Sequence, residues 1–337
     1  MSIDAKIEER KKRWSKFLEL DGSQRFMHWI YIEDEASPAP LPNPENKKAR
    51  IEYAWMQYNF QEDDAIPCLH PYTGTEIFAE AFGCKVYRPE DNNPFALPFV
   101  SSVNEASRIK IPPIDTPPLG TLFEIADELY KRAGSRALMR LVDIQSPMDV
   151  TALIWDKNAL YISLLETPEA IQELSGKCKQ PQVDFLEEWF RRYGQDFIAH
   201  FPDYYMPWGI TLSEDEVGAV STTMFEKFSL PELIELSNQF GGIGIHCCAH
   251  ARHQWYSFKQ IPNLRMLNLV QPPDVLDDAI IYFANHTAQS PGWQTEWDLS
   301  LGPTQFPENA HLVLCSLVSN REQAQRRADL FNRLYRS

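Results

Sequence analysis

His246 and Cys248 lie two positions apart at the end of an apolar, glycine-rich run, residues 241–248. In a β-strand, side chains two positions apart point to the same face, so an imidazole and a thiol would lie side by side at a strand end. Cys315 ends a second apolar run, residues 311–315. One histidine and two cysteines can serve as the protein ligands of a catalytic zinc, with a fourth position left for water or substrate.

The same three residues also allow a purely structural interpretation. Free cysteine is commonly buried and inert, so His-x-Cys on its own favours core packing, and Cys315 weakens that interpretation without excluding it. Bound zinc would hold a substrate thiol as the thiolate, which is the better nucleophile near neutral pH. Cys247 is predicted to point the other way, into the helix layer.

Three acidic residues, Glu214, Asp215 and Glu216, follow Trp208 and Gly209. A carboxylate there could act as a general acid or base, orient a metal ligand or bind a cationic part of a substrate. The alternative is a solvated helix N-terminus, which the helix dipole favours. The two interpretations are balanced for Asp215, and the second is favoured for Glu216. Asp215 and Glu214 are the candidate catalytic residues.

A few other polar residues are weaker candidates. Asp143 lies near the end of another apolar run and is a carboxylate of the same kind as Asp215. His250 and His253 could be alternative ligands or could orient one, but a loop position is favoured for both. His28 and Tyr31 are expected in the core or at its rim.

These side chains must be positioned by the elements around them. Apolar runs predict buried strands at residues 26–32, 138–144, 197–201, 242–248, 265–270 and 311–317. Helical signals alternate with these strands, which indicates parallel β-α units. A chain of 337 residues has room for about eight such units, which favours an α/β (β/α)₈ TIM-type barrel. Residues 1–337 are treated as one barrel domain, with an N-terminal helical extension over residues 1–24.

Local signals predict where helices begin and end. Residues 120–132 are amphipathic and end before Gly134, and residues 167–169 (Thr-Pro-Glu) are typical of a helix start. Ser229 and Ser319 each precede a glutamate by three positions, as in a capping box. Proline-rich segments predict surface connections at residues 37–44, 111–119 and 271–274.

Composition excludes several classes of function. A net charge of −15 argues against a nucleic-acid partner. No apolar run approaches the roughly 20 residues that span a bilayer, and the charged N-terminus lacks a signal-peptide core, so we expect a cytoplasmic protein with no membrane partner. Six cysteines in so long a chain do not suggest a disulfide framework. Dinucleotide-binding, P-loop and serine hydrolase motifs are missing from the sequence.

Four segments, taken in order, resemble the uroporphyrinogen decarboxylase-like superfamily. They are residues 63–67 (Asp-Asp-Ala-Ile-Pro), 81–86 (Ala-Phe-Gly-Cys-Lys-Val), 213–218 (Ser-Glu-Asp-Glu-Val-Gly) and 241–248 (Gly-Gly-Ile-Gly-Ile-His-Cys-Cys). The resemblance runs from about residue 63 to the C-terminus and implies a (β/α)₈ barrel. The superfamily also contains zinc-dependent methyltransferases that act with corrinoid proteins.

Two branches of that superfamily compete. The decarboxylase branch needs no metal and holds substrate carboxylates with an N-terminal Arg-Gln-Ala-Gly-Arg motif, whereas residues 31–35 here read Tyr-Ile-Glu-Asp-Glu. Because carboxylates need cationic partners, this departure counts against porphyrinogen decarboxylation. Similarity to the methyltransferase branch implies zinc on His246, Cys248 and Cys315, although Ala249 replaces a usual glycine.

We therefore expect a zinc-dependent methyltransferase that moves a methyl group between a corrinoid and a thiol or similar acceptor. Its substrate would be a small molecule, and a partner protein would carry the corrinoid. The alternative is a metal-free decarboxylase with Asp215 or another acid near the reacting centre. A third hypothesis is a non-catalytic barrel that binds a corrinoid protein or a small ligand.

Overall fold

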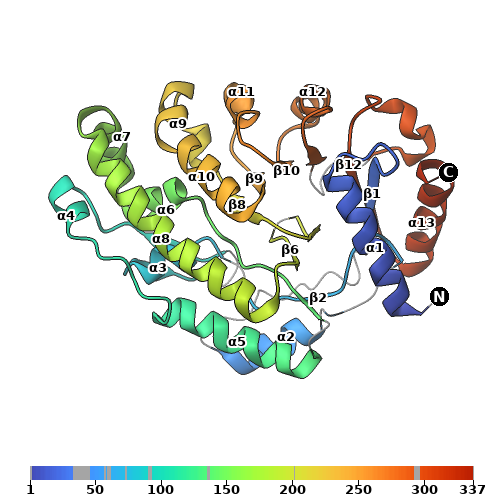
Figure 1. Cartoon of the computed structure of the whole chain (residues 1–337), viewed down its shortest axis with the longest axis horizontal. Helices are drawn as coiled ribbons and strands as arrows, with labels where there is room; N and C mark the ends of the chain where they lie inside the picture. Colours follow the sequence, from blue (N-terminus) through green and yellow to red (C-terminus); the bar gives the residue numbers. More distant parts are fainter. Residues whose placement is uncertain are drawn as a thin grey trace.

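Parallel strands alternate with helices in the computed structural model of the chain. The structure describes residues 2–32, 46–56, 58, 62–72, 74–89, 93–134, 137–200, 202–291 and 297–336. Helices surround a central group of strands, and the chain passes around this group once from the blue N-terminal part to the red C-terminal part (Figure 1). This is the α/β barrel architecture that the alternation of strand and helix signals predicts.

Eight of the described strands form the barrel wall. They are β1 (Phe26–Ile32), β2 (Cys68–Leu69), β5 (Leu138–Met139), β8 (Ile210–Ser213), β9 (Ile243–Cys247), β10 (Leu264–Leu269), β11 (Ala288–Ser290) and β12 (Leu312–Val318). Two short antiparallel hairpins lie outside this series: β3 (Lys85–Tyr87) with β4 (Phe95–Leu97), and β6 (Phe197–Ile198) with β7 (Tyr205–Met206).

Hydrogen bonds join the wall strands into a ring. Six of them form one parallel sheet in the order β1-β12-β11-β10-β9-β8, and β2 pairs with β5. A parallel bridge between Gln145 and Ser213 joins the segment after β5 to β8. On the other side, Asp64 N donates to His28 O at 2.9 Å and joins the segment before β2 to β1. The carboxyl ends of the strands therefore meet at one end of the barrel, where functional groups of this fold lie.

The helices pack outside the wall. They are α1 (Ile3–Leu18), α2 (Lys47–Met56), α3 (Ile77–Ala81), α4 (Val103–Ser107), α5 (Pro117–Ala133), α6 (Pro147–Ile154), α7 (Lys157–Glu166), α8 (Pro168–Tyr193), α9 (Thr222–Phe228), α10 (Leu230–Phe240), α11 (Trp255–Phe258), α12 (Pro273–Phe283) and α13 (Arg321–Tyr335). None of the helices in the described part of the chain combines the length and apolar character needed to cross a bilayer. The predicted N-terminal helix is confirmed as α1.

Most of the strand predictions are confirmed, with three differences. Regular pairing over residues 138–144 ends at residue 139, and residues 197–198 pair antiparallel with β7 in addition to a parallel bridge between Ile198 and Arg140. The sequence patterns did not reveal β2, β8 and β11. These strands are two to four residues long, and β8 and β11 carry polar residues, so no apolar run marks them.

Helix ends differ in detail from the predicted caps. Gly134 ends α5 with φ of 84°, as expected. Ser229 makes no capping hydrogen bond, since it also ends α9 and has a helical backbone, and the Glu232 side chain accepts from Ser175. At α13 the N-cap is Asn320 rather than Ser319.

Two of the proline-rich connections are shorter than predicted, since α5 begins at Pro117 and α12 at Pro273. The connection predicted at residues 37–44 lies outside the described residues.

Candidate active site at the carboxyl ends of the strands

His246 and Cys248 lie side by side where β9 ends. His246 Nε2 is 2.9 Å from Cys248 Sγ. His246 is half-buried and Cys248 is exposed, whereas Cys247 between them is fully buried. The alternation of a β-strand, predicted from the spacing, therefore places the imidazole and the thiol on one face. The pair forms an accessible nitrogen and sulfur donor set at the barrel mouth.

Asn268 on the neighbouring strand β10 fixes the orientation of the His246 ring. Asn268 pairs with His246 in the sheet, its Oδ1 contacts His246 Nδ1, and its Nδ2 donates to Ser290 O at 2.6 Å. Because the amide nitrogen is engaged by a carbonyl, the amide oxygen must face the ring and accept from Nδ1–H. His246 Nε2 therefore carries the lone pair that a metal would use.

Asn268 was not predicted as a site residue from the sequence, although an amide side chain inside the apolar run of residues 265–270 could have indicated a functional position.

Asp215 contacts the backbone of the candidate ligand Cys248. Its Oδ1 accepts from Cys248 N at 2.5 Å. Asp149 in turn accepts from the N–H groups of Asp215 and Glu216, both at 2.7 Å. Burial raises the pKa of Asp215, while the Cys248 N–H opposes that rise. Asp215 thus fixes the turn that carries Cys248, and its predicted role as an acid or base stays a prediction.

Glu214 lies on the other side of β8. Ser213 points into the barrel and donates to Asp143 at 3.0 Å, so the next side chain along the strand faces the helices. Glu214 is fully buried, and the Ser146 hydroxyl opposes the rise in the pKa of its carboxyl that burial causes. Burial raises its pKa to about 8. At this position the Glu214 carboxyl lies away from the interior face of β8. The catalytic role predicted for Glu214 stays a prediction.

Cys315 lies on β12, opposite Trp29 of β1 in the sheet. It is 3% exposed, and burial raises the pKa of its thiol to about 12. In the sheet order, β10 and β11 separate its strand from β9. Among the residues that the structure describes, no three His, Cys, Asp or Glu side chains are close enough together to hold a metal. The structure therefore brings His246 and Cys248 together and leaves Cys315 apart.

Asp143, which is buried, and His200, which is half-buried, form a polar pair inside the barrel. Asp143 Oδ2 lies 3.3 Å from His200 Nε2, and its Oδ1 accepts from Gln145 Nε2 at 2.9 Å as well as from Ser213. Burial alone would raise the pKa of Asp143, but His200 and the Ser213 hydroxyl together lower it. His246 contributes to the same lowering, which puts it within electrostatic reach of Asp143.

From the sequence, Asp143 was predicted as a weak candidate. His200, in the predicted strand at residues 197–201, was not predicted as a site residue.

Arg140 is a cation in the same interior, and each of its three guanidinium nitrogens contacts a protein acceptor. Its guanidinium donates to His200 O and to His70 Nδ1 at 3.1 Å, and it forms an ion pair with Asp203 at 2.6 Å. A substrate carboxylate would have to compete with Asp203 for this cation.

The remaining histidine predictions fall in the core and in loops. His28 is buried, its Nε2 lies 2.9 Å from Ser316 Oγ, and its ring stacks on Phe331, so the core prediction is confirmed. Burial lowers its pKa to about 4. His250 is exposed in a loop, and His253 lies in a short 3₁₀ turn with a ring nitrogen 3.0 Å from Val220 O.

Comparison with known proteins agrees with this fold. A solved structure described as a methyltransferase from Methanosarcina mazei is similar with a TM-score of 0.68 and 10% sequence identity, over 97% of this chain and 99% of that one. At this identity the likeness shows the shared fold. No curated protein matches the sequence. The family model for uroporphyrinogen decarboxylase (URO-D) matches residues 71–271, which include β9 and the His246–Cys248 pair. The chain belongs to the uroporphyrinogen decarboxylase family.

Proposed function

We propose that this protein is a zinc-dependent methyltransferase that uses a thiol or similar small acceptor. One observation carries the proposal: Asn268 leaves His246 Nε2 unprotonated, and that atom lies beside Cys248 Sγ. Family membership and the fold shared with a methyltransferase support the same assignment. A corrinoid on a partner protein is proposed as the methyl donor.

The residues fit two positions of a zinc site. Zinc bonds of about 2.0 Å to nitrogen and 2.3 Å to sulfur in a tetrahedral site put the two ligand atoms roughly 3.5 Å apart. The observed separation of 2.9 Å would have to widen by roughly 0.6 Å for both atoms to bind zinc. Cys315 is proposed as the third ligand from its order in the sequence, and it would have to approach from β12. Bound zinc would supply a Lewis acid that holds a substrate thiol as the thiolate.

The protein's own residues would orient the ligands and handle the proton. Asn268 fixes the His246 ring, and Asp215 fixes the backbone at Cys248. We assign uptake of the proton that a thiol loses to the His200 ring nitrogen that does not face Asp143, because Nε2 already donates its proton to the Asp143 carboxylate.

The test is metal content in the freshly purified, reduced protein, measured for four forms of the chain. About one zinc per chain is expected in the wild type and in Cys247→Ala, whose thiol is buried on the other side of β9. Cys248→Ala and Cys315→Ala should lose the metal and the transfer of methyl from methylcobalamin to a thiol. Zinc retained in Cys315→Ala would remove this residue from the ligand set, and a metal-free wild type would overturn the proposal.

A second candidate is decarboxylation of uroporphyrinogen without metal, which the matched family model favours. Turnover of uroporphyrinogen by the purified protein would establish it. The engagement of Arg140 with Asp203 weakens this candidate, because a substrate with many carboxylates needs available cations. Corrinoid binding with neither activity would support a non-catalytic barrel.

A further inference from the structure

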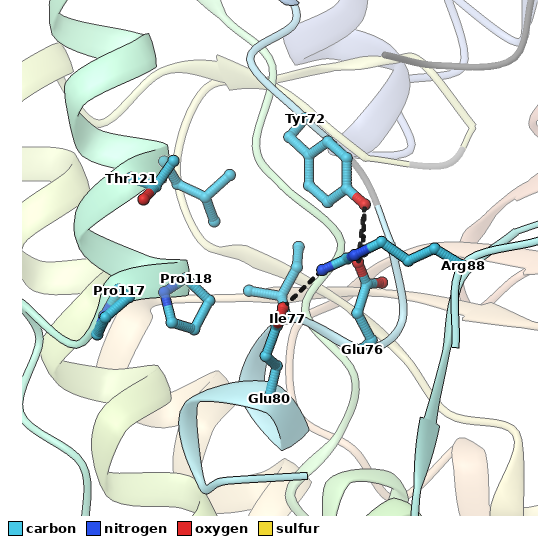
Figure 2. Close-up of a pocket in the computed structure, with 9 residues that line it drawn as sticks. Tyr72, Glu76, Ile77, Glu80, Arg88, Pro117, Pro118 and Thr121 are labelled. Carbon is cyan, nitrogen blue, oxygen red and sulfur yellow. Dashed lines mark hydrogen bonds and ion pairs between the residues drawn. The ribbon is translucent and has the colours of Figure 1, made fainter. Parts of the chain in front are cut away.

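A cavity of about 110 Å³ lies beyond the carboxyl end of β2, between α3 and α5. Figure 2 shows Pro117, Pro118 and Thr121 of α5 on one side, and Tyr72 and Arg88 on the other. None of the residues that line it belongs to the His246–Cys248 site. For comparison, a cavity of about 150 Å³ in another protein is large enough to bind benzene. The space therefore suits a ligand with about five non-hydrogen atoms.

Two carboxylates and one guanidinium give the cavity an excess of negative charge. Arg88 donates to Glu76 at 2.8 Å and to Glu80 at 2.9 Å. Glu76 is 1% exposed, and one of its oxygens lies over Gly74 with no hydrogen-bond partner. Arg88 is thus the counter-ion of both Glu76 and Glu80. In such a poorly hydrated cavity, an added positive charge would be favourable.

The wall opposite Arg88 does not favour an anion. Helix N-termini bind anions through their unpaired N–H groups, but α5 begins with Pro117 and Pro118, which have none. These rings instead offer an apolar surface. Across the cavity, the Tyr72 hydroxyl donates to Glu76 at 2.7 Å, and the Arg50 guanidinium lies over the Tyr72 ring at 5.6 Å.

We propose that this cavity binds a small organic cation, an ammonium group on a short apolar chain. The ammonium group would be held at Glu80, and the chain would lie on the two prolines. Glu80 is the acid to which a ligand has access, because 30% of its side chain is exposed while Glu76 is closed off. The site is additional to the one proposed for methyl transfer.

Calorimetric titration with three probes of the same shape tests the charge preference. Butylammonium, butan-1-ol and butyrate carry positive, zero and negative charge on the same chain, and each is titrated into the full-length protein at low salt. Saturable binding of butylammonium, at least about tenfold tighter than that of butyrate, is the expected result. Equal binding of all three probes, or no heat from butylammonium at millimolar concentration, would overturn the proposal.

Two variants locate the binding. Glu80→Gln removes one carboxylate and should weaken butylammonium about tenfold while improving butyrate. Thr121→Leu narrows the cavity from α5 and should abolish binding of every probe. Glu128→Gln, an exposed acid on the same helix, is the matched control and should bind like the wild type. Unchanged affinity in both Glu80→Gln and Thr121→Leu, with intact circular dichroism, would place the cation elsewhere and refute the assignment.

Discussion

At the residue scale, the chemistry of His246 depends on an amide on the next strand. A free imidazole can carry its proton on either nitrogen, and only one of these tautomers leaves Nε2 able to bind a metal. The hydrogen bond from Asn268 Nδ2 to Ser290 O determines which end of the amide faces the ring. The tautomer of His246 is therefore set two strands away, at β11.

Replacing Asn268 by alanine should weaken zinc binding. Loss of the partner that orients a metal-bound histidine typically costs 10- to 100-fold in affinity, and we expect that range here. Asn268→Asp retains an acceptor oxygen and should bind zinc at least as tightly as the wild type. Competition with a chelating dye measures both affinities. Equal affinity in Asn268→Ala and the wild type would show that His246 does not need this contact.

Glu214 should make stability depend on pH. Burial raises its pKa in the folded protein to about 8, above the value of the unfolded chain, so the folded state binds the proton more tightly. The resulting stabilisation is complete below the unfolded pKa and is lost as pH rises through about 8. Between pH 5 and 8, we expect the free energy of unfolding to fall by at most about 1.4 kcal/mol per pH unit from this group.

Urea unfolding of Glu214→Gln, compared with the exposed control Glu128→Gln, checks this expectation. The slope of the free energy of unfolding against pH should flatten only in Glu214→Gln. Equal slopes in the two variants would contradict the expected contribution of Glu214.

At the scale of elements, the caps show how closely local sequence signals predict a helix start. Asn320 accepts from Gln323 N at 3.0 Å, and the Gln323 side chain accepts from Ser319 N at 3.0 Å. The arrangement is related to a capping box one residue after the predicted Ser319–Glu322 pair, but the return bond reaches the N–H of the residue before the N-cap. The helix it begins, α13, packs against β1 and β12, so a shift of one position changes which side chains reach the wall.

Asn320→Ala should destabilise the protein by about 1 kcal/mol, because an N-terminal amide of α13 loses its acceptor. Ser319→Ala should cost less, since Ser319 is not the acceptor for Gln323 N. Thermal unfolding of both variants distinguishes the two caps. A larger loss of stability in Ser319→Ala than in Asn320→Ala would indicate that Ser319 is the N-cap, as predicted from the sequence.

At the scale of the whole molecule, Asp64 connects the two ends of the chain. It is fully buried and pairs with Arg13 of α1 at 2.8 Å and with Arg336, which follows α13. Burial would raise its pKa, but Arg336 and Arg13 lower it below the usual value. Figure 1 shows α1 and α13 on the same side of the barrel, beside β1 and β12. The ion pairs therefore hold the first and last helices where the ring of strands closes.

Asp64→Asn should lower the free energy of unfolding by about 1.5–3 kcal/mol, because two partly exposed arginines lose the charged acceptor of their hydrogen bonds. Glu62→Gln is the matched control. Its pair with Lys6 is exposed, and its loss should cost less than about 1 kcal/mol. Urea unfolding at neutral pH measures both. Similar small losses in the two variants would mean that Asp64 does not join the termini energetically.

The alternation of strands and helices and the side-by-side placement of His246 and Cys248 could be predicted from the sequence. Both follow from local backbone geometry, because the two-residue period of a strand needs no distant contact. The sequence did not predict that Asn268 orients His246, that Asp215 holds the backbone at Cys248, or that Cys315 stands apart on β12. These relations join residues far apart in the chain, and the register of strands and the packing of helices set them.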